Sequence, residues 1–126
     1  MTTALCVVDA ANVVGSVPDG WWRDRRGATE RLRDRLAGLG ERGLPGWPPP
    51  LEVVLVVEGR ARGVEGLSTV RVVSATGSGD DAVVDLVAAA HDRRVLVVTA
   101  DRALIARVAE HGGSAVGPRT VLSRAG

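Results

Sequence analysis

Residues 4–12 read Ala-Leu-Cys-Val-Val-Asp-Ala-Ala-Asn, an apolar run over residues 4–8 that is followed at once by the carboxylate of Asp9. Three further valine-rich runs follow it, at residues 51–57, 69–74 and 95–99. Each run is nearly continuous, whereas a strand with one face in water would alternate apolar and polar residues. The four runs therefore predict strands that are buried on both faces, as in a parallel sheet.

Helical patterns lie between these runs. They predict helices over Thr29–Leu39, Asp80–Ala90 and Arg102–Glu110, because apolar residues recur there at spacings of three and four. The segment Gly38–Pro50 is predicted to be a connecting loop, and Ser114–Val116 is a candidate fifth strand. No clear pattern follows from residue 118 onward. Strands that alternate with helices predict an α/β fold with right-handed crossovers and helices on both faces of the sheet.

The composition limits the kind of protein. A chain of 126 residues, 45% of them hydrophobic, predicts one domain over residues 1–126. The net charge of +1 argues against a protein that coats polyanions, although every basic residue is an arginine. The single Cys6 excludes an internal disulfide framework. Asp9 and Asn12 interrupt the first apolar stretch, so neither a signal peptide nor a membrane span is predicted and the expected location is the cytoplasm.

Acidic residues follow the predicted strands. In open parallel sheets, ligand sites form beyond the carboxyl ends of the strands. These ends lead here into Asp9, Glu58, the pair Asp80 and Asp81, and Asp101. Carboxylates gathered at one edge repel one another unless a cation neutralises them, and a site with oxygen ligands alone favours Mg²⁺ or Mn²⁺. One cysteine and two distant histidines do not supply a usual zinc site.

Most of these residues also have an ordinary structural explanation. Asp80 is placed to cap the N-terminus of its helix, and Asp81 to favour the helix dipole. Asp9 would suit a turn, and Asn12 an Asx turn. Asp85 is harder to explain in this way, because it lies beyond the first helical turn among apolar residues, where a charge needs a local polar site.

One competing motif is superficially similar to a dinucleotide-binding fingerprint. Gly77-x-Gly79-x-x-Ala82 follows a predicted strand, opens a helix and precedes an acidic residue at a suitable distance. The N-terminus of that helix would have to receive a pyrophosphate, however, and Asp80 and Asp81 would place like charges against it. A nucleotide-binding enzyme is therefore the less favoured interpretation.

Three motifs together resemble the NYN domain family of PIN-like ribonucleases, especially its YacP-like branch. The resemblance spans roughly residues 4–116 and rests on the motifs Val7-Val-Asp-Ala-Ala-Asn12, Gly79-Asp-Asp-Ala-Val-Val-Asp85 and Val97-Val-Thr-Ala-Asp101. It implies a PIN-like three-layer fold with a central parallel sheet of four or five strands in the order 3-2-1-4-5, flanked by helices. That order would place Asp101 next to Asp9.

The resemblance also implies a function, that of a metal-dependent endoribonuclease that hydrolyses phosphodiester bonds of single-stranded RNA. Asp9, Asp81 and Asp101 would bind Mg²⁺ or Mn²⁺, Asn12 would bind metal-bound water or substrate, and Asp85 would be a further acid. The presence of Asp80 beside Asp81 leaves open which of the two is the ligand. The predicted catalytic residues are Asp9, Asn12, Asp81, Asp85 and Asp101, and the predicted metal ligands are Asp9, Asp80, Asp81 and Asp101.

Tryptophan and arginine are interleaved after the first strand, and arginines also follow the second. Bases stack on tryptophan rings and phosphates pair with arginine in proteins that bind single strands. The predicted RNA-binding residues are Trp21, Trp22, Arg23, Arg25, Arg26, Arg60 and Arg62. The alternative is that these tryptophans cover a core that has few aromatic residues.

Two further functions remain open at this stage. The main alternative is a PIN-like module that binds RNA or a protein partner without cutting, and another is a hydrolase that acts on a smaller phosphate ester. Carboxylates that repel one another favour an enzyme, because a site without metal has no use for them. The sequence predicts no oligomeric state.

Overall fold

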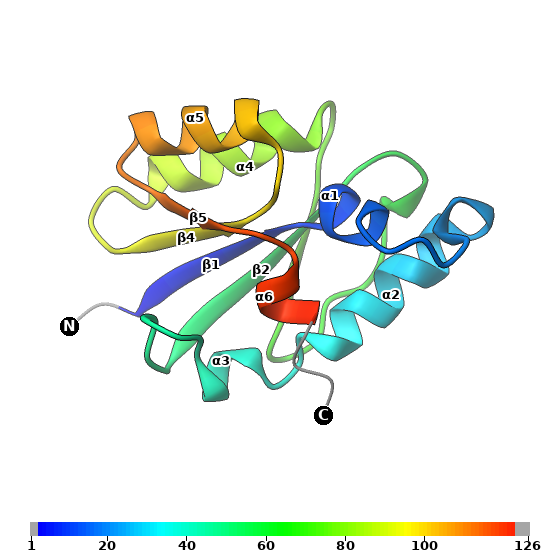
Figure 1. The fold of residues 1–126 in the computed structure, drawn as a ribbon, viewed down its shortest axis with the longest axis horizontal. Helices are drawn as coiled ribbons and strands as arrows, with labels where there is room; N and C mark the ends of the chain where they lie inside the picture. Colours follow the sequence, from blue (N-terminus) through cyan, green and yellow to red (C-terminus); the bar gives the residue numbers. More distant parts are fainter. Residues whose placement is uncertain (1–2, 123–126) are drawn as a thin grey trace.

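A parallel sheet of five strands forms the centre of the fold (Figure 1). The computed structural model describes residues 3–122. The sheet order is β3-β2-β1-β4-β5, and all four pairs of neighbours are parallel. The strands are β1 (Ala4–Asp9), β2 (Leu51–Val57), β3 (Arg71–Ser74), β4 (Val95–Val98) and β5 (Ser114–Val116). This confirms the predicted α/β fold and its strand order 3-2-1-4-5, including the fifth strand.

Helices cover both faces of the sheet (Figure 1). One face carries α4 (Gly79–Ala89) and α5 (Arg102–Glu110). On the other lie α1 (Ala10–Gly15), α2 (Arg25–Arg35), α3 (Leu39–Arg42) and α6 (Arg119–Leu122). Two short 3-10 helices, η1 (Trp21–Arg23) and η2 (Gly59–Ala61), lie after α1 and after β2. Within residues 3–122, no helix has the length and apolar character needed to cross a membrane.

The continuous apolar runs are explained by two separate cores. Along β1, Cys6 and Val8 face the core shared with α1, α2, α3 and α6, while Leu5 and Val7 face the core shared with α4 and α5. All four side chains are at most 2% exposed. Full burial of a valine or leucine contributes about 1.5–3 kcal/mol each, so the central strands anchor both layers.

The helix predicted over residues 29–39 is wrong in its extent, because the chain forms two helices there. The first, α2, begins at Arg25, where the Asp24 side chain accepts a hydrogen bond from the backbone N–H of Gly27. It ends at Arg35, and α3 begins at Leu39 within the segment predicted to be a loop. A Cβ on Gly40 would lie 2.6 Å from the Leu51 carbonyl oxygen, so glycine there lets α3 approach β2.

The register of the sheet positions the candidate site. In β1, Val8 pairs with Val98 of β4, and Asp9 pairs with Val56 of β2. The chain segments that follow β1, β2 and β4 therefore leave the sheet at the same edge. As predicted, Asp9 and Asp101 follow neighbouring strands at one rim of a parallel sheet.

Candidate active site

Asp9 is the most buried carboxylate of the described chain and ends β1 at the carboxyl edge of the sheet. Its residue is 3% exposed, because α1 begins immediately after it and β2 and β4 flank it. Burial raises the pKa of the Asp9 carboxyl above its ordinary value, the hydrogen bond from Thr99 opposes this, and the charges of Asp80 and Glu58 add to it. Asp9 is thus a buried acid whose negative charge is poorly compensated.

Thr99 connects the ends of β1 and β4. Its hydroxyl donates a hydrogen bond of 2.9 Å to Oδ2 of Asp9 and accepts one of 3.2 Å from the backbone N–H of Asp101. Thr99 is 1% exposed. Sequence reasoning left it aside, although a hydroxyl at the end of a buried strand was the signal that could have identified it. This side chain fixes the orientation of Asp9.

Asn12 and Asp101 both hold the loop between β4 and α5. Oδ1 of Asn12 accepts a hydrogen bond of 2.8 Å from the backbone N–H of Ala100, so it ties α1 to this loop. Oδ1 of Asp101 caps α5 by accepting hydrogen bonds from the N–H groups of Ala103 and Leu104, at 3.0 and 3.1 Å. Asp101 therefore combines a capping role with its position near Asp9.

The structure distinguishes Asp80 from Asp81, a choice that the sequence left open. The pKa of Asp80 is raised by burial and by the charges of Asp101 and Glu58, while Arg107 opposes the rise and Asp81 adds to it. Asp81 is exposed, and its Oδ1 lies 3.0 Å from the guanidinium of Arg107. Asp80 is therefore the inner acid, and Asp81 forms a surface ion pair.

Two further predictions for α4 are wrong. Asp80 does not cap the helix, because the hydroxyl of Ser78 accepts the capping hydrogen bond from the backbone N–H of Asp81. Asp85 does not lie in a buried polar site, because it is exposed on the side of α4 opposite the buried Val83 and Val87. The charge of Asp85 is not among those that shift the pKa of Asp9 or Asp80.

Glu58 joins the site, although it was not among the predicted catalytic residues or metal ligands. It follows β2, and its carboxylate rests against the first residue of α4, where a Cβ on Gly79 would overlap it. Its charge contributes to the raised pKa values of both Asp9 and Asp80. We use the name acid cluster for Asp9, Glu58, Asp80 and Asp101.

The acid cluster has the type of ligand atom that a divalent metal ion requires, but not the close grouping. Its donors are all carboxylate oxygens, which Mg²⁺ and Mn²⁺ prefer. The pKa values of Asp9 and Asp80 are raised by burial and, to a smaller extent, by the neighbouring negative charges, and a cation would offset both effects. The side chains of these acids lie farther apart than in a formed metal site. Across residues 3–122, no three side chains of His, Cys, Asp or Glu are grouped so that they could hold a metal ion. The acids thus lie at the same edge of the sheet, but their side chains do not form a coordination shell.

Tryptophan and arginine are interleaved from η1 to the start of α2, and Trp21 and Arg25 line a cavity together with Glu58 of the acid cluster. The rings of Trp21 and Trp22 meet edge to face, with centroids 5.9 Å apart. The guanidinium of Arg25 lies 5.3 Å from the centroid of Trp21, and that of Arg23 lies 5.7 Å from that of Trp22. Trp22 is 54% exposed, so it does not serve as a core residue.

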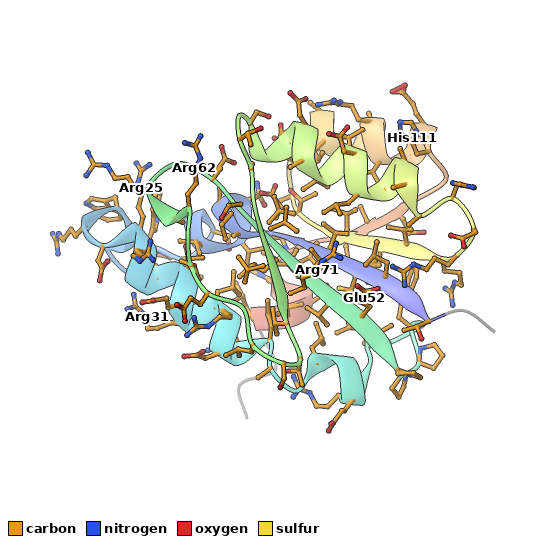
Figure 2. The ribbon with its side chains drawn as sticks, turned by 180° about the vertical axis from the view of Figure 1, so that it is seen from behind. Arg25, Arg31, Glu52, Arg62, Arg71 and His111 are labelled. Atoms are coloured by element: carbon orange, nitrogen blue, oxygen red, sulfur yellow. The ribbon has the colours of Figure 1, made fainter. Side chains whose placement is uncertain are left out.

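The remaining predicted RNA-binding arginines differ in their surroundings. Arg26 donates to the backbone carbonyls of Arg62 and Gly63, at 2.8 and 3.1 Å, and so attaches α2 to the loop after η2. Arg60 is exposed within η2. Figure 2 shows Arg25 and Arg62 at the same end of the molecule, opposite His111. Arg26 thus has a structural role, whereas Arg23, Arg25, Arg60 and Arg62 are exposed, and Arg25 lines a cavity together with Glu58.

Comparison with known proteins supports the fold. No family model matches the sequence, and no curated protein matches it. Among solved structures, Rae1 (YacP) from Bacillus subtilis has a TM-score of 0.76 and 19% identity, over 98% of this chain and 72% of that one. Its W164L mutant has a TM-score of 0.74 and 17% identity, over 96% and 74%. At this level of identity the similarity is one of architecture, and the chain has a YacP-like fold.

Proposed function

We propose that this chain is a metal-dependent endoribonuclease of the PIN-like NYN type, which hydrolyses phosphodiester bonds of single-stranded RNA at the acid cluster. One observation carries the proposal. Asp9, Glu58 and Asp80 come from three separate segments of the chain, and the pKa of Asp9 and of Asp80 is raised, first by burial and further by the negative charges of the neighbouring acids. Folded proteins rarely keep such an arrangement unless it holds a cation or performs chemistry.

Asp9, Asp80 and Asp101 would hold Mg²⁺ or Mn²⁺, with Glu58 beside them. When bound, the metal supplies a Lewis acid that stabilises charge on a phosphate and activates water. Asp81 is not proposed as a ligand, because Arg107 already neutralises it. This choice follows the contacts in the structure and revises the assignment that the resemblance implied.

The protein's own residues would position and tune the acids. The hydroxyl of Thr99 fixes one oxygen of Asp9, and the capping hydrogen bonds fix one oxygen of Asp101. Asn12 holds the loop between β4 and α5 in place.

The surface beside the cluster suits a single strand. Trp22 exposes its ring and carries a stacked arginine, Arg23, at a distance typical of cation–π contacts. An aromatic face binds bases without regard to sequence, and arginine binds the backbone phosphates. Arg60 and Arg62 would extend this surface on the loop after β2.

The test is cleavage of diverse single-stranded RNAs by the purified chain with Mn²⁺, with Mg²⁺ and with a chelator. Metal-dependent cleavage that Asp9→Asn and Asp101→Asn abolish, while both variants still bind RNA, is the expected result. An Asp85→Asn variant is the matched control, because that residue is exposed and lies outside the cluster.

A second candidate, an RNA-binding module that does not cut, is favoured by one observation. Within residues 3–122, no three acidic side chains lie close enough together to hold a metal ion. If the wild type binds RNA but cleaves none under any of these metal conditions, this function replaces the first.

A further inference from the structure

A cavity of about 220 Å³ adjoins the acid cluster. It is a pocket open to solvent between α1, η1, α2 and η2, and its lining includes Ala10, Trp21, Arg25, Glu58 and Ala61. Ala10 directly follows Asp9, and Glu58 belongs to the acid cluster. The cavity and the cluster therefore share a wall.

One side of the cavity is built from flat groups. Trp21 is partly buried, and the planar guanidinium of Arg25 lies 5.3 Å from the centre of its ring. Small side chains, Ala10 and Ala61, line the cavity as well and leave room beside the ring. Walls of this kind suit a planar aromatic ligand, which stacks on tryptophan and on the face of an arginine.

The polar groups of the cavity restrict which ligand fits. The carboxylate of Glu58, which lies against Gly79 of α4 at the border of the cavity, only accepts hydrogen bonds, whereas Arg25 only donates them. The Thr29 hydroxyl also lines the cavity, but it already donates to the backbone carbonyl of Arg25. Among the four RNA bases, guanine alone presents two N–H donor groups side by side, at N1 and N2, and it also offers O6 and N7 as acceptors. Adenine and cytosine each present one amino group next to a ring nitrogen whose lone pair a carboxylate repels. Uracil presents one N–H between two carbonyl oxygens.

We propose that this cavity is a guanine-binding subsite, in which the base stacks on Trp21 and donates from N1 and N2 to Glu58. The proposal rests on the ribonuclease function proposed above, because it places one guanine of the RNA next to the phosphate that the acid cluster would cut. It goes beyond that function by giving the enzyme a preference for sequence.

Binding of nucleosides without metal tests the subsite separately from cleavage. Guanosine, adenosine, cytidine and uridine are the probes, since a phosphate would be repelled by the neighbouring acids. The ¹H–¹⁵N signals of the tryptophan indoles report the site. Guanosine is expected to shift the Trp21 signal and to leave that of the buried Trp47 in place, with an affinity about tenfold or more above that of the other three.

Two variants and one control separate the parts of the subsite. Glu58→Gln is expected to lower the preference for guanosine over adenosine by about tenfold or more, because it removes a charge-assisted pair of hydrogen bonds. Trp21→Ala is expected to weaken guanosine binding by about fivefold or more. Glu110→Gln makes the same chemical change at the far end of α5 and is expected to bind guanosine as the wild type does. Melting curves confirm that each variant is folded.

The outcomes distinguish this proposal from the first. Guanosine that binds no better than adenosine, or that binds equally well to Glu58→Gln, overturns the subsite even if RNA is cleaved. Selective guanosine binding by a chain that cleaves no RNA supports the subsite and overturns the proposed ribonuclease function. If Glu58→Gln does not fold, the ranking of the four nucleosides on the wild type decides the matter alone.

Discussion

The hydroxyl of Thr99 donates to Oδ2 of Asp9 across a distance of 2.9 Å, and both side chains are almost completely buried. The contact joins residues 90 positions apart in the chain and closes the gap between the ends of β1 and β4. A buried carboxylate needs such a donor, because an unpaired charge away from water is strongly unfavourable. Thr99 is therefore as much a part of the site as the acid that it contacts.

Substitution of Thr99 by valine keeps the shape of the side chain and removes the hydroxyl. The free energy of unfolding is expected to fall by about 1–3 kcal/mol, because Asp9 loses its donor and the backbone N–H of Asp101 loses its acceptor. Urea denaturation measures the change. Thr69→Val, at an exposed position, is the control. Equal stability of the two variants would show that the hydrogen bond contributes nothing net.

The raised pKa of Asp80 predicts a pH dependence of stability. The folded chain holds this proton more tightly than the unfolded chain, whose value is near 3.8. Above that value the folded state therefore carries more protons, and the free energy of unfolding falls as the pH rises toward neutral. The ionised Asp80 thus destabilises the folded chain at neutral pH, and acidification toward the raised pKa relieves this.

Asp80→Asn tests this sign. The variant is expected to be more stable than the wild type at neutral pH, and the difference is expected to shrink as the pH falls. Thermal denaturation over a pH series measures it. Asp92→Asn removes a carboxylate from an exposed position and is expected to show no such trend. A wild type that is more stable than Asp80→Asn at neutral pH would contradict the repulsion among these acids.

Metal binding should discriminate between the two neighbouring aspartates. Mn²⁺ at one hundred times its Kd is expected to stabilise the wild type by about 2.7 kcal/mol. Asp80→Asn should lose most of this gain, whereas Asp81→Asn should keep most of it, because Arg107 pairs with Asp81 at the surface. Differential scanning calorimetry with and without Mn²⁺ provides the measurement. The opposite order of the two variants would assign the ligand to Asp81.

The surface near η1 predicts a loss of RNA affinity without a loss of stability. Trp22→Ala combined with Arg23→Ala is expected to weaken binding of single-stranded RNA by about 1–3 kcal/mol and to make it less dependent on salt. Fluorescence anisotropy over a salt series measures both. Arg31→Ala, an exposed arginine on α2 (Figure 2), is the control.

Arg26→Ala provides the contrasting case. Its two hydrogen bonds attach α2 to the loop after η2, so the variant is expected to lose about 1 kcal/mol of stability with little change in RNA affinity. The reverse pattern, weaker RNA binding at unchanged stability, would support the prediction that Arg26 binds RNA.

Much of the fold was predictable because strands that are buried on both faces of the sheet appear in the sequence as continuous apolar runs. The runs at residues 4–8, 51–57 and 95–99 became β1, β2 and β4, and parallel pairing then brought Asp9 near Asp101. The choice between Asp80 and Asp81 was not predictable in this way. It depends on Arg107, which α5 brings beside α4 and which no local pattern links to either aspartate.

Asp85 was misjudged for a different reason. Val83 and Val87 are four residues apart and define the buried face of α4, and this spacing already placed Asp85 on the opposite side. The apolar residues next to it in the chain suggested burial, but neighbours in a helix do not share a face. Helical periodicity was the better guide here than local composition.

Oδ1 of Asp101 caps α5, and this affects the choice of an inactive variant under the proposed function. Asparagine at this position would keep the oxygen that caps α5 and remove the negative charge, since asparagine caps helices about as well as aspartate. Alanine would remove both, at a cost of about 1 kcal/mol. Under the proposed ribonuclease function, asparagine is therefore the appropriate substitution for capturing RNA without cleavage, whereas alanine would combine the loss of charge with a destabilised α5.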